Sequence, residues 1–164
     1  MRRGMGLVAV ATLSLLVGCS SAAIPNPRLS LRYDGDWRAT DVDAEIRRAG
    51  SEDVAVANLG HTAWVSHHVA VVRTSEKPHY HRFHDMTVFV LRGEGVLTVE
   101  QKQMPMKMGD VVHVPRGTPH FFRNTGESPA VAAVVFSPPF DGRDTVAAPE
   151  GADELSSQSA VSPP

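Results

Sequence analysis

The sequence predicts an all-β barrel or sandwich with one short helix, on two observations. From Asp53 onward, short runs rich in β-branched and aromatic residues are separated by Gly, Pro, Asn or Asp. The length and spacing of these runs are typical of antiparallel sandwiches and barrels rather than of βαβ units. The predicted strands lie within residues 54–59, 62–73, 87–91, 96–99, 111–114, 121–122 and 131–136.

A short helix is expected just before the first strand. Residues 40–48 begin with a capping residue, carry acids early and end in arginines, a charge order that favours a helix. Residues 19–38 contain two prolines and are expected to form a tether, so the barrel domain is predicted to span residues 39–142. Residues 143–164 are rich in Ala, Ser, Pro and acids with few large apolar side chains, so they are expected to be disordered.

Residues 1–18 have the composition of an export signal. Two arginines precede an uncharged and mostly apolar run, Leu7–Val17, that is too short to span a bilayer as a helix. The run ends in Leu-Val-Gly-Cys19, which resembles the lipobox of bacterial lipoproteins, where cleavage before the cysteine precedes its lipidation. We therefore expect a lipid-anchored envelope protein, and Ser20 favours the outer membrane over the inner one. The alternative is an ordinary secretory signal with a chance cysteine.

Composition excludes one class of partner and indicates chemistry inside the barrel. The chain has a formal net charge of −2, and removal of Arg2 and Arg3 with the signal lowers it to −4. No basic patch is left to neutralise phosphates, so nucleic acid is not an expected partner. All eight histidines lie between His61 and His120. Because imidazole is the commonest metal ligand and a general base, this bias predicts a functional site in the folded part.

A pair of histidines has the spacing of metal ligands on a strand. His79 and His81 are two residues apart, so in a strand their side chains point to the same face and can hold one ion. A third histidine from far along the chain can complete three corners of the coordination sphere. Three histidines with open positions for water or substrate are typical of catalytic rather than closed structural sites.

Two segments resemble the paired motifs of the cupin superfamily. The second segment fits the whole motif, in the order Gly109, five residues, Pro115, one residue, Gly117, two residues, His120, three residues and Asn124. The first segment supplies the His-x-His pair and the closing Gly93, and the resemblance covers about residues 53–140. It implies a cupin-type jelly-roll barrel (double-stranded β-helix) in which His79, His81 and His120 bind one divalent metal ion, with a glutamate as fourth ligand. Fe, Mn, Ni and Zn are the candidate metals, and Cu is less favoured.

The chain departs from this pattern at the fourth ligand. Counting back from Gly93 places Met86 there, whereas counting forward from His81 places Asp85 there. A slip of one residue turns a strand side chain to the other face. We favour the count from Gly93, which keeps the strand in register with Met86, Val88 and Val90 facing inward. It predicts a three-histidine site, and the alternative is a barrel that has lost its metal and has Met86 as a core filler.

Four further histidines are candidates for lining the pocket: His67, His68, His84 and His113. His67 and His68 are adjacent in a predicted strand and face opposite ways, so one of them at most faces inward. Three methionines also alternate: Met104, Met106 and Met108. They indicate one face of a strand, and a copper site on soft sulfur is the alternative.

Two classes of function remain open. The first is a metal-dependent oxygenase, isomerase or hydrolase that acts on a small molecule inside the barrel, which open metal positions favour. The second is a non-catalytic protein that senses or stores a small molecule or a metal, which the missing glutamate and the lipid anchor favour. A homodimer is also predicted, from the resemblance and from the apolar outer positions Phe89 and Leu91.

Overall fold

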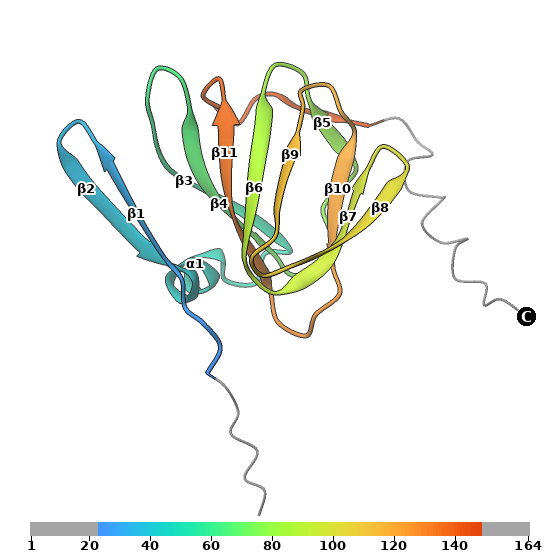
Figure 1. Ribbon diagram of the computed structural model, residues 1–164, viewed down its shortest axis with the longest axis horizontal. Helices are drawn as coiled ribbons and strands as arrows, with labels where there is room; N and C mark the ends of the chain where they lie inside the picture. Colours follow the sequence, from blue (N-terminus) through green and yellow to red (C-terminus); the bar gives the residue numbers. More distant parts are fainter. Residues whose placement is uncertain (1–22, 149–164) are drawn as a thin grey trace, which may run out of the picture.

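The computed structural model describes residues 23–148 (Figure 1). The predicted signal and Cys19 lie outside the described residues, as does the tail from residue 149 onward. The all-β prediction is confirmed, because two five-stranded antiparallel sheets form a jelly-roll barrel. One sheet has the strand order β3 (Val54–His61), β4 (Ser66–Val72), β11 (Ala130–Ser137), β6 (Asp85–Arg92) and β9 (Val111–Val114). The other has the order β12 (Thr145–Ala147), β5 (His79–His81), β10 (His120–Asn124), β7 (Glu94–Val99) and β8 (Lys102–Lys107).

A hairpin occupies most of the region that was expected to be a tether, and the helix predicted at residues 40–48 follows it. Strands β1 (Arg28–Tyr33) and β2 (Asp36–Asp41) pair in antiparallel, and helix α1 (Val42–Ala49) follows directly. Asp41 caps the helix by accepting a hydrogen bond from the Ala44 amide (2.8 Å). Within residues 23–148, no helix is both long and apolar enough to span a bilayer.

The helix covers the outer face of the first sheet. Val42 and Ala49 of α1 form one buried cluster with outward-facing side chains of β4, including Val69 and Val71. Leu91 of β6 packs against this same cluster. The outer face is therefore partly covered, and of the two positions that suggested a homodimer only Phe89 is exposed, at 39%.

Strand β12 lies in the segment that was expected to be disordered. Thr145 pairs with His81 and Ala147 with His79, so β12 extends the second sheet beside β5. The strand has only three residues, too few to carry an apolar alternation that would predict it. The remainder of the predicted tail, from residue 149, lies outside the described residues.

The register of β6 is the one that the count from Gly93 predicts. Met86, Val88 and Val90 face the barrel interior, and Met86 pairs with Val114 of β9. Gly93 ends the strand with a φ of +82°, a conformation that L side chains rarely adopt. A Cβ atom at this position would also lie 2.8 Å from the Ala130 Cα atom, so glycine is needed at this turn for two reasons.

The alternating methionines form part of the wall of the barrel. Met106 lies on β8, is 8% exposed and packs in a cluster with Val90 and Leu97. Met104 packs against the same cluster, whereas Met108 follows the strand and is 47% exposed. This arrangement agrees with a strand face, as the alternation predicted.

Candidate metal centre

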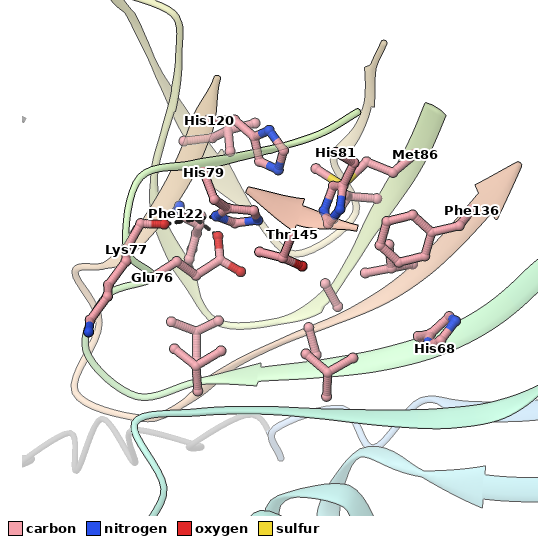
Figure 2. Close-up of a pocket in the computed structure, with 18 of the residues that line it drawn as sticks. His68, Glu76, Lys77, His79, His81, Met86, His120, Phe122, Phe136 and Thr145 are labelled. Atoms are coloured by element: carbon pink, nitrogen blue, oxygen red, sulfur yellow. Dashed lines mark hydrogen bonds between the residues drawn. The ribbon is translucent and has the colours of Figure 1, made fainter. Parts of the chain in front are cut away.

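Three histidines from two neighbouring strands converge inside the barrel (Figure 2). His79 and His81 lie on β5, and His120 begins β10 directly opposite His79 in the antiparallel register. One ring nitrogen from each histidine can be chosen so that all three atoms lie within 4.8 Å of one another. The alternation of side chains along β5 puts both of its histidines on the same face, and the strand register brings in the third.

Each of the three rings is oriented by a hydrogen bond to a backbone carbonyl. The Nδ1 atoms of His79, His81 and His120 lie 2.8, 3.1 and 2.8 Å from the carbonyl oxygens of Lys77, Asp144 and Thr118. A carbonyl oxygen only accepts, so each Nδ1 atom carries the proton and donates. In a neutral ring, the lone pair then belongs to Nε2. Such a hydrogen bond on the other ring nitrogen is the usual support of a metal-bound histidine.

The donor set fits a metal ion. The Nε2 atom of His120 is buried and has no hydrogen-bond partner, although buried polar atoms are nearly always satisfied. Burial lowers the pKa of His81 and of His120 to about 4, and in both cases the nearby His79 adds to the effect. Both rings are therefore neutral at pH 7, which is the form that binds metal.

A cavity of about 960 Å³ opens beside the three histidines. Its wall is mainly apolar and includes Met86, Val88 and Leu97. Phe136 and Phe140 stack with ring centroids 4.6 Å apart, and each lies about 5 Å from the His81 ring. A large apolar space with a few polar groups gathered at one place is the usual form of a small-molecule site.

The two residues considered for the fourth ligand lie on opposite faces of β6. Met86 is 7% exposed and lines the cavity. Asp85 points outward, where its carboxylate accepts hydrogen bonds from the Arg116 side chain (2.8 and 3.1 Å) and from the Arg116 amide (2.9 Å). These hydrogen bonds lower the pKa of Asp85 to about 2. Asp85 is thus engaged with an arginine and turned away from the three histidines.

A carboxylate that the sequence analysis missed lies inside the cavity. Glu76 precedes β5 in the loop after β4, and Figure 2 shows it beside His79. The Phe122 amide donates to Glu76 Oε2 (2.9 Å), and burial raises the pKa of Glu76, partly offset by His79 and by this hydrogen bond. Its position three residues before His79 in a loop belongs to no strand pattern, so no signal in the sequence pointed to it.

Of the four further histidines, only His68 lines the cavity. It bonds to Ser66 Oγ (2.9 Å) and lies well away from the three-histidine cluster in Figure 2. His67 faces the opposite side of β4, where it bonds to the Tyr33 hydroxyl (2.5 Å) beneath the hairpin. His113 is exposed on the outer face of β9, where it bonds to a threonine of β6 (3.1 Å).

His84 is buried and bonds to the C-terminal segment, but it does not line the cavity. Its Nδ1 atom lies 2.6 Å from the carboxylate of Asp144, which also accepts from the Phe83 amide (2.7 Å). The carbonyl oxygen of Asp144 is the one that accepts from His81. His84 and Asp144 therefore hold the segment that orients one of the three converging histidines.

Comparison with known proteins places this barrel in a family. A family model described as "Cupin domain" matches residues 66–136. An uncharacterized protein of Aquifex aeolicus is 41% identical over 108 residues, which are 65% of this chain and 88% of that protein.

Two solved structures share the fold. TT1209 from Thermus thermophilus has a TM-score of 0.52 at 25% identity, covering 58% of this chain and 95% of its own. Streptomyces PAC13 with uridine has a TM-score of 0.51 at 18% identity, covering 58% and 78%. The family match over strands β4 to β11 shows that this barrel is a cupin domain.

Proposed function

We propose that the chain binds one divalent metal ion through the Nε2 atoms of His79, His81 and His120. The observation that supports this most strongly is the buried and unpartnered Nε2 atom of His120, beside two rings whose Nδ1 atoms are likewise occupied by carbonyls. Imidazole nitrogens suit Fe, Ni and Zn, whereas a site selective for Cu(I) would need soft sulfur ligands.

The proposed function is that of a metal-dependent enzyme acting on a small molecule in the cavity. Three protein ligands leave open positions, at which a bound metal ion supplies Lewis-acid chemistry. The apolar wall and the stacked Phe136 and Phe140 would hold the carbon skeleton of the molecule and exclude water from the reacting end. An oxygenase, an isomerase and a hydrolase are the reaction classes that fit such a site.

A non-catalytic binding protein is the second candidate. The observation that favours it is Met86, a side chain with no proton to give or take, at the place where the family resemblance implies glutamate. The two candidates differ in what happens to a bound molecule. Small molecules that raise the melting temperature of the metal-loaded protein would be incubated with it and followed by mass spectrometry. Metal-dependent conversion of a bound molecule supports the enzyme, and tight binding without conversion contradicts it.

Met86 is expected to be a neighbour of the metal rather than a ligand. Met86→Leu keeps the volume and apolar character of the side chain, so it should cost less than about 1.5 kcal/mol of stability. Zn²⁺ affinity, measured by competition with a chromophoric chelator, should change less than about threefold, which corresponds to roughly 0.6 kcal/mol. Loss of Zn²⁺ binding in this variant would instead show that sulfur is a ligand.

A lipid anchor at the cell envelope is proposed from residues 1–20. The basic start, the short apolar run and Cys19 support it. Cys19→Ser removes the thiol that would carry the lipid, so the variant should move from the membrane fraction to the soluble envelope fraction. Ser20→Ala keeps the thiol and should stay with the membranes. A Cys19→Ser variant that still sediments with membranes contradicts the anchor.

A further inference from the structure

Glu76 lines the cavity, and hydrogen bonds to β10 fix the position of its carboxylate. Its amide donates to the Phe122 carbonyl oxygen (2.9 Å), and the Phe122 amide donates back to its Oε2 atom (2.9 Å). Both the backbone and the side chain of Glu76 are thereby tied to β10, two residues from His120. The close-up shows the side chain beside His79, within the lining of the cavity (Figure 2).

In the cavity the Glu76 carboxylate has His79 as a basic neighbour, but it is paired with no lysine or arginine. Among the ion pairs of residues 23–148, none includes Glu76. The neighbouring Lys77 also lines the cavity, but Figure 2 shows its ammonium group pointing away from the Glu76 carboxylate. With Oε2 held by one amide, the Oε1 atom keeps its capacity to accept a hydrogen bond from a molecule in the cavity.

Glu76 contributes no atom to the group of converging candidate metal ligands. The group whose members lie within 4.8 Å of one another contains the three histidines and no carboxylate. The carboxylate therefore stands to one side of the metal position, where a molecule bound at the metal would meet it. Figure 2 shows the apolar side chains of Phe136 and Met86 across the cavity from it.

We propose that Glu76 determines which small molecules the metal end of the cavity accepts. In its ionised form, which a bound divalent cation favours, the carboxylate accepts a hydrogen bond from a hydroxyl or ammonium group, and its charge disfavours carboxylates and other anions at the open metal positions. The ligand class is thus an alcohol or amine with an apolar body that fits the remaining wall. This assignment rests on the proposed three-histidine metal site.

The test compares an anionic and a cationic probe in the Co²⁺-loaded full-length protein. Acetate and benzylammonium are titrated separately, and their proton linewidths report proximity to the paramagnetic ion. Glu76→Gln keeps the size of the side chain and the hydrogen bond from the Phe122 amide, but removes the charge. We expect about tenfold tighter acetate binding and about tenfold weaker benzylammonium binding, because a unit charge within several ångströms of the probe is lost.

The control variant is Glu127→Gln, which makes the same change at an exposed residue that does not line the cavity. It should change neither affinity by more than about twofold. The assignment would be overturned if Glu76→Gln left both affinities unchanged or shifted them by the same factor in the same direction. It would also be overturned if the control variant had the same effects as Glu76→Gln. Visible Co²⁺ absorption is recorded before any probe is added, and its absence would overturn the metal site and this assignment together.

Discussion

His81→Ala is expected to lower the affinity for a divalent metal ion more than about 100-fold. Loss of a group that merely orients a metal ligand already costs about 10- to 100-fold, and His81 is proposed as a ligand itself. The barrel should stay folded, because the ring is held by one hydrogen bond to the Asp144 carbonyl oxygen and by packing on Phe136 and Phe140.

Equilibrium dialysis against Zn²⁺ measures this effect, and circular dichroism verifies the fold. His113→Ala is the matched control, since His113 is an imidazole on the outer face of β9 that bonds to Thr87. The control should bind one Zn²⁺ per chain with unchanged affinity. If His81→Ala bound Zn²⁺ as tightly as the control does, His81 would not be a ligand.

The second large effect is a loss of stability in mild acid when the protein is free of metal. Burial lowers the pKa of His68, His81 and His120 to about 4, whereas a histidine in the unfolded chain titrates near 6.5. As the pH falls from 6.5 to 4, the unfolded state takes up protons that the folded state does not. The free energy of unfolding is therefore highest above pH 6.5, and it falls by up to about 3 kcal/mol per histidine as the pH drops to 4.

Urea unfolding of the metal-free protein at pH 7 and pH 4.5 checks this result. The free energy of unfolding should fall by several kcal/mol, and saturating Zn²⁺ at pH 7 should raise it, because a ligand that binds only the folded state stabilises it. His68→Gln removes one titrating ring outside the metal cluster and should reduce the pH dependence, whereas His113→Gln should not. Equal stability at the two pH values would contradict the account of these buried rings.

The strands that could be predicted are those rich in β-branched and aromatic residues. Strand β6 is the clearest case, because its position relative to Gly93 predicted that Met86 faces inward and Asp85 outward. The hairpin β1–β2 could not be predicted, since its alternation is short and interrupted by charged residues, and its stability depends on packing over β3 and α1. Strand β12 depends on backbone pairing with β5 and on the hydrogen bonds of Asp144, the residue before it, both of which the tertiary fold creates.

The residues of the candidate site also divide into those that a local sequence pattern predicts and those that it does not. The three converging histidines could be grouped from a strand alternation and a motif spacing, both of which are local properties of the sequence. Glu76 and Asp144 could not be found in this way, because each acts through a contact that the tertiary fold creates. Glu76 is tied to Phe122, 46 residues away, and Asp144 accepts from His81, 63 residues away.

The most direct test of the metal site observes the imidazole nitrogens themselves. Long-range ¹H–¹⁵N correlation spectra of the ¹⁵N-labelled, EDTA-treated protein would be recorded during titration with diamagnetic Zn²⁺. We predict that, at one equivalent, the Nε2 resonances of His79, His81 and His120 shift to metal-bound values, while their Nδ1 atoms stay protonated on the carbonyl oxygens of Lys77, Asp144 and Thr118. Spectra in which these three rings are unaffected, or in which other histidines respond instead, would contradict the account.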